Sequence, residues 1–122
     1  MGDVLPIGGG SLNFSTTEHV VGTWIDGKPL YQKTYSWPLG NATQDMHAID
    51  GQETMCVFNM YGVVIKNDCT ESYPLPRVHD NALSGQIGVQ FYQNQGVNIL
   101  YRGGNWTGYT VYVTLNYTKT TD

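Results

Sequence analysis

The sequence predicts an all-β domain, specifically an antiparallel β-sandwich of jelly-roll type. Stretches rich in Val, Ile, Tyr and Thr recur about every ten to fifteen residues, with turns rich in Gly and Asn between them. Only 13% of the residues are charged, and Thr, Asn, Gln and Ser fill most polar positions. Those residues suit a pleated surface, whereas exposed helix faces usually carry Lys and Glu. No stretch shows a convincing helical period.

The chain of 122 residues is long enough for one domain with one core. The Gly-rich run Gly8–Ser11 is typical of a flexible linker. We therefore expect residues 1–13 to be a lead-in and residues 14–122 to form the domain.

The first strong signal is a β-hairpin. Two β-rich runs, Val20–Ile25 and Leu30–Trp37, flank the pair Asp26-Gly27. An Asp-Gly pair readily adopts the positive φ angles of a tight turn, so these two strands are expected to be antiparallel neighbours.

The middle of the chain predicts a loop with a short strand over Pro38–Glu53, then a long strand over Met55–Lys66. Gly62 interrupts the long strand and suggests a β-bulge there. After a polar turn, Tyr73–Pro76 is expected to be extended, because each Pro disfavours the helical conformation of the residue before it.

The last third has the clearest alternation of apolar and polar residues. Gln86–Gln93, Val97–Arg102 and Tyr109–Thr118 are expected to be three strands of a meander. Tyr109 and Tyr117 fall on the apolar face of the last strand, which places them in the core.

Charge and composition exclude several partner classes. The net charge is −4, and the six Lys and Arg residues are scattered, so a nucleic-acid partner is not expected. No apolar run approaches the roughly 20 residues of a membrane span, and the N-terminus lacks the pattern of a signal peptide. Cys56 and Cys69 fit no zinc or redox motif; two free thiols are favoured over a disulfide, which the sequence leaves open.

The sequence offers no constellation for catalysis. His19, His47 and His79 lie in different segments, and the carboxylates lie in predicted turns. We expect no enzyme activity, no metal site and no cofactor.

One turn stands out as a candidate ligand site. Trp106 lies in the Gly-rich segment 102–108, where core periodicity does not account for an indole. An exposed ring there would offer a flat face to a sugar, with Arg102 and Asn105 as hydrogen-bond donors and Tyr109 beside them. The alternative is that Trp106 folds back over the end of the sandwich as part of the core.

Two segments resemble known proteins. FSTTEHVVGTWIDGKPLYQKTYSW (residues 14–37) and GYTVYVTLNYTKTTD (residues 108–122) are similar to segments near the C-terminus of bacteriophage tail fibres and related phage structural proteins. The resemblance implies a homotrimeric head at the tip of a fibre, joined to an upstream shaft. It implies attachment to a glycan or protein receptor on the host surface, and location in the virion after synthesis in the host cytoplasm.

The alternatives are a structural trimerisation domain of a head fibre or baseplate, and an accessory carbohydrate-binding domain of a depolymerase or lysin. The resemblance supplies no binding residues, so Trp106 and its neighbours stand on the residue pattern alone.

Overall fold

The computed structural model describes residues 14–77, 86–102 and 105–122. The expected lead-in over residues 1–13 lies outside the described residues. The structure is all-β, as predicted from the sequence, with one short 3-10 turn, η2 (Gln52–Thr54), in the described part. The strands are β1 (His19–Thr23), β2 (Pro29–Pro38), β3 (Gln44–His47), β4 (Met55–Lys66), β5 (Ser72–Leu75), β6 (Gln86–Tyr92), β7 (Gly96–Arg102) and β8 (Tyr109–Lys119).

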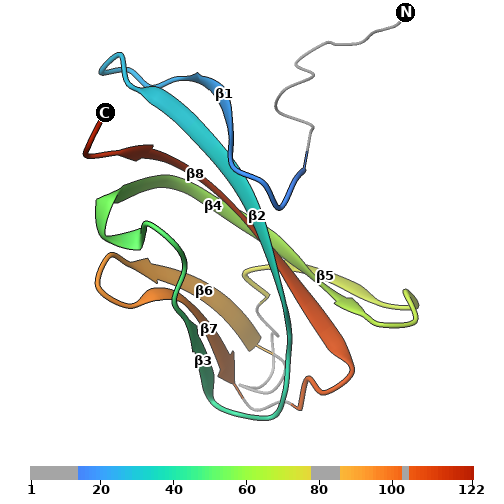
Figure 1. The fold of residues 1–122 in the computed structure, drawn as a ribbon. Helices are drawn as coiled ribbons and strands as arrows, with labels where there is room; N and C mark the ends of the chain where they lie inside the picture. The colour runs from blue at the N-terminus through green and yellow to red at the C-terminus, as the bar shows by residue number, and fades with distance from the viewer. Residues whose placement is uncertain (1–13, 78–85, 103–104) are drawn as a thin grey trace, which may run out of the picture.

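The strands form two antiparallel sheets (Figure 1). One sheet has the order β1-β2-β8-β4-β5, and the other has the order β3-β7-β6. Both sheets contribute to one apolar core, which confirms the β-sandwich. Its buried members are Leu39, Met55, Val64, Leu75, Ile87, Val97, Ile99, Tyr101, Trp106, Val111, Val113, Leu115 and Tyr117.

The predicted hairpin is present as β1 and β2. Its turn is closed by a hydrogen bond from the Gly27 N–H to the Trp24 carbonyl, at 2.9 Å. Gly27 has φ of 89°, a left-handed conformation that glycine adopts without steric cost. The Asp-Gly pair was therefore a correct guide to the turn.

The bulge in β4 does not occur at Gly62, and that prediction was wrong. The register shifts between Val57 and Asn59, so Phe58 is the extra residue. Gly62 has a different role, because a Cβ there would lie 2.3 Å from the carbonyl oxygen of Tyr112. The glycine allows β4 and β8 to approach closely.

The expected meander is also wrong in its last step. β6 and β7 pair with each other, but β8 crosses to the other sheet and lies between β2 and β4. Both faces of β8 are buried, since Val113 on one face and Thr114 on the other are almost inaccessible. A strand that is covered on both faces occupies the centre of a sheet rather than continuing a hairpin at its edge.

Candidate functional site

The Trp106 turn is part of the core, and the expectation of an exposed indole was wrong. Trp106 is 5% exposed, and its ring makes edge-on contacts with Tyr73 and Tyr109 at centroid distances of 5.9 and 5.1 Å. Its backbone N–H donates to the Gly40 carbonyl at 2.9 Å, which holds the turn against the loop after β2. This placement matches the alternative, in which Trp106 folds back over the end of the sandwich as part of the core.

The other residues proposed for that site do not form an open pocket with it. The Tyr109 hydroxyl donates to Glu71 Oε1 at 2.8 Å, and the Asn105 carboxamide oxygen accepts hydrogen bonds from the N–H and hydroxyl of Thr107. The side chain of Arg102 lies outside the described residues, as does His79. The described residues of this turn therefore present Trp106 as a buried ring and not as an open face for a ligand.

Glu71 and Arg77 complete the packing around this turn. Hydrogen bonds from Tyr73 and Tyr109 lower the pKa of the Glu71 carboxyl, which keeps it ionised at neutral pH. The Arg77 guanidinium lies over the Tyr73 ring, 4.3 Å from its centroid, and 5.6 Å from that of Trp106. These contacts fix the aromatic rings and leave them little freedom to receive a ligand.

The side of the five-stranded sheet that faces away from the three-stranded sheet, termed the outer face, has an unusual composition. Side chains alternate along a strand, so the residues of β8 between its core positions point to the outer face, as do their cross-strand partners. None of these residues is Lys, Arg, Asp or Glu. They are His19, Gln32, Thr34, Ser36, Pro38, Cys56, Asn59, Tyr61, Val63, Ile65, Ser72, Pro74, Thr110, Tyr112, Thr114, Asn116 and Thr118.

A ladder of amides and hydroxyls forms the floor of the outer face. Asn59 Nδ2 donates to Asn116 Oδ1 at 3.1 Å, and Asn116 Nδ2 donates to Gln32 Oε1 at 3.0 Å. In the next row, the hydroxyls of Thr34 and Thr114 are 2.8 Å apart and hydrogen-bonded. Gln32, Asn116 and Thr114 are buried, at 2%, 9% and 4% exposed, although no second layer of strands among the described residues covers them, whereas Asn59 is exposed.

Aromatic side chains lie near this ladder, and the Tyr61 hydroxyl contacts Gln32 Oε1 at 3.5 Å. Trp24 and Phe58 stack with centroids 4.0 Å apart, and Phe14 meets Tyr61 edge-on at 6.4 Å. Each pair joins a residue that flanks β1 in the sequence to a residue of β4. Tyr112, on the central strand, stands beyond the second pair and is 37% exposed.

Between these rings the outer face is hollowed into a groove of about 350 Å³. Its lining is apolar except for two hydroxyls and the phenols. The lining residues are Phe14, Thr34, Tyr61, Gly62, Val63, Tyr112 and Thr114. Sequence reasoning did not find this groove. The signal that could have found it is the absence of charged residues at alternate positions of the two long strands 55–66 and 109–118.

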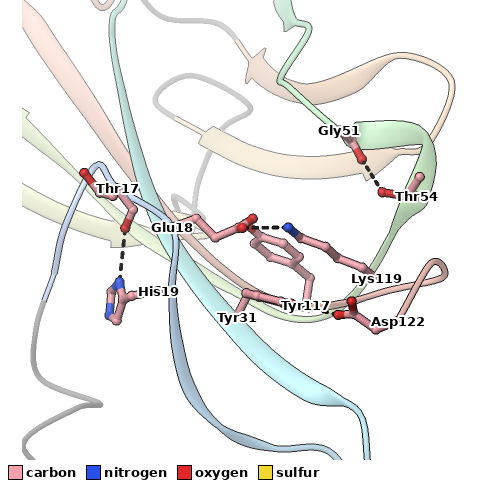
Figure 2. Close-up of polar contacts among 9 residues, drawn as sticks. All are labelled: Thr17, Glu18, His19, Tyr31, Gly51, Thr54, Tyr117, Lys119 and Asp122. Atoms are coloured by element: carbon pink, nitrogen blue, oxygen red, sulfur yellow. Dashed lines mark hydrogen bonds and ion pairs between the residues drawn. The ribbon is translucent and has the colours of Figure 1, made fainter.

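A second, polar cleft of about 320 Å³ lies around Glu18 (Figure 2). The Glu18 carboxylate accepts hydrogen bonds from Lys119 Nζ at 2.6 Å and from the Tyr117 hydroxyl at 2.5 Å. Burial alone would raise the Glu18 pKa, but these two hydrogen bonds outweigh it and lower the pKa. Nearby, the Tyr31 hydroxyl donates to Asp122 at 2.8 Å. Glu18 thus fastens the segment before β1 to β8, and Asp122 joins the end of the described chain to β2 (Figure 2).

Glu18, in the polar cleft, is not poised as a general acid. A general acid needs a raised pKa, whereas Glu18 is held ionised. Within residues 14–77, 86–102 and 105–122, no three His, Cys, Asp or Glu side chains converge as metal ligands. Cys56 and Cys69 are both exposed and free.

No family model, curated protein or solved structure matches the chain. In the described part, no helix has the length and apolarity that a membrane crossing requires.

Proposed function

We propose that this chain is a non-catalytic attachment domain at the tip of a bacteriophage tail fibre, where it binds a glycan on the host surface. The resemblance of residues 14–37 and 108–122 to phage tail-fibre proteins motivates the biological setting. The observation that carries the proposal is the uncharged outer face, with its exposed aromatic rings and its groove.

The outer face has the properties of a recognition surface. Removing water from uncharged side chains costs little, which is why charged residues are depleted and aromatic residues enriched at the centres of interfaces. Phe14 and Tyr112, which both line the groove, are exposed. A monomeric protein gains nothing from exposing several large rings on one face, so a contiguous aromatic surface indicates a binding partner.

The proposed domain is a homotrimer that is carried on the virion. The β1–β2 hairpin supports self-association, because Ile25 at its tip is 92% exposed and Val20 on its outer edge is also exposed. Three copies on one fibre tip would let individually weak sites act together.

The test is binding by the purified full chain. The fluorescently labelled protein is applied to an array of bacterial surface polysaccharides and to cells from a panel of bacterial strains. We expect retention on at least one polysaccharide and on cells that display it. A folded protein that binds neither polysaccharides nor cells would contradict the attachment function and favour a purely structural role in the fibre.

A further inference from the structure

We propose that the groove in the outer face binds an uncharged sugar ring of a neutral glycan chain. This inference rests on the proposed attachment function and specifies the chemistry of its ligand. Stacking on aromatic rings and hydrogen bonding to the Thr34–Thr114 pair would hold the sugar.

The groove combines apolar walls with a polar floor. Thr34, Thr114 and Tyr61 are cross-strand neighbours in one row of the sheet, and Tyr112 and Val63 are neighbours in the next. A pyranose has the same division, with C–H groups on its faces and hydroxyls at its edge, so rings that present a flat face suit it. The groove volume of about 350 Å³ is near the lower end of the range for small-molecule sites.

The two threonine hydroxyls have hydrogen-bonding capacity left for a ligand. Only one of their two protons is used in the 2.8 Å hydrogen bond between them. The second proton and the remaining lone pairs have no partner among the residues that the structure describes. Thr114 is 4% exposed, so a hydrogen bond formed there would be shielded from water. A sugar hydroxyl can donate and accept at once, which matches this pair.

The absence of charge selects against acidic sugars. A carboxylate in the groove would lose water without gaining a cation, because none of the described residues that line the groove is Lys, Arg or His. The net charge of −4 adds long-range repulsion. Uronic acids and other anionic glycans are therefore expected to bind more weakly than their neutral counterparts.

The experiment is an NMR titration of the full chain with free sugars. The probes are the methyl glycosides of glucose, galactose, rhamnose and N-acetylglucosamine, each at millimolar concentration, and the matched methyl glucuronide and galacturonide. At least one neutral glycoside should shift the amide signals of Thr34 and Thr114 with a Kd of about millimolar order. The matched uronide should bind at least about tenfold more weakly.

Substitutions test the assignment to the groove. Tyr112→Ala should raise the Kd about tenfold, and Thr114→Val, which preserves shape but removes the hydroxyl, should raise it several-fold. Tyr92→Ala is the matched control, since Tyr92 is a similarly exposed tyrosine on the three-stranded sheet. Ser36→Lys places an ammonium group in the same cross-strand row as Tyr112 and should recover uronide binding.

The outcomes separate this inference from the attachment function. Shifts confined to other regions, or equal binding of neutral and acidic sugars, would overturn the groove assignment even if the protein still binds cells. A Tyr112→Ala variant that loses self-association would show the groove to be a subunit contact and would equally overturn it. Sugar binding in the groove without any binding to polysaccharides or cells would instead refute the attachment function.

Discussion

The indole of Trp24 stacks on the ring of Phe58, with centroids 4.0 Å apart and planes 18° apart. This contact joins the residue that opens the hairpin turn to the residue that is extruded by the bulge in β4. The bulge makes Phe58 the extra residue opposite β8, and from that position its ring contacts Trp24.

Phe58→Ala is expected to destabilise the domain by about 1 kcal/mol, since an aromatic pair contributes roughly that much beyond its buried area. Urea unfolding followed by circular dichroism would measure it. The control is Tyr92→Ala, which removes an exposed ring that has no aromatic partner among the described residues. Equal stability of the two variants would show that the stack does not hold the hairpin.

Trp106→Ala is expected to cost about 3–5 kcal/mol, because it opens a cavity in the core. Trp106→Phe should cost much less, since it keeps a ring in place and removes an indole N–H that is buried without a hydrogen-bond partner in the described structure. Denaturant unfolding of the two variants would distinguish these costs. An unchanged unfolding midpoint for the alanine variant would restore Trp106 as a candidate ligand residue.

The lowered pKa of Glu18 predicts that the folded protein loses stability in acid. Its pKa is lowered in the folded protein, so its stabilisation is fully present above the unfolded value near 4.5 and is lost as the pH falls through the folded value. The carboxylate is partly exposed, so the effect after solvent screening is about 1 kcal/mol. Wild type should lose this stability as the pH falls below the unfolded value near 4.5 and through the lower folded value.

Glu18→Gln should lack that component of the pH dependence, whereas Glu53→Gln, at an exposed position in η2, should keep it. Unfolding free energies measured across this pH range would decide. Parallel pH profiles for wild type and Glu18→Gln would exclude the ion pair as the cause.

Self-association is expected to yield three times the 13.6 kDa chain mass in light scattering on a sizing column. Ile25→Asp places a charge at the exposed hairpin tip and should dissociate the trimer without lowering the secondary-structure content. Thr70→Asp, at an exposed turn distant in sequence from the hairpin, is the control. A wild-type protein that stays monomeric at micromolar concentration would refute the trimer.

Strand positions could be predicted from the sequence, because alternation and turn residues are local signals. The Asp26-Gly27 turn and the strand over Met55–Lys66 agree with the structure. Strand partners could not be predicted. The alternation of apolar and polar residues in the sequence of β8 indicates a strand, but it does not indicate which strands lie beside it. The same limit explains Trp106, whose burial depends on Gly40 and Tyr73, residues far from it in sequence.

The outer face escaped prediction for a related reason. Each of its strands supplies only a few uncharged residues, which is unremarkable in one strand. Their significance appears when β2, β8 and β4 lie side by side and the aromatic residues of separate segments meet over one floor.

The position of β8 has a consequence for synthesis of the protein. β8 follows the other described strands in the sequence, yet it pairs with both β2 and β4 at the centre of the larger sheet (Figure 1). A growing chain on the ribosome therefore cannot close that sheet until β8 has been synthesised. Chains that terminate before β8 would lack the central strand and expose the unpaired edges of two long strands, which makes them substrates for degradation or aggregation.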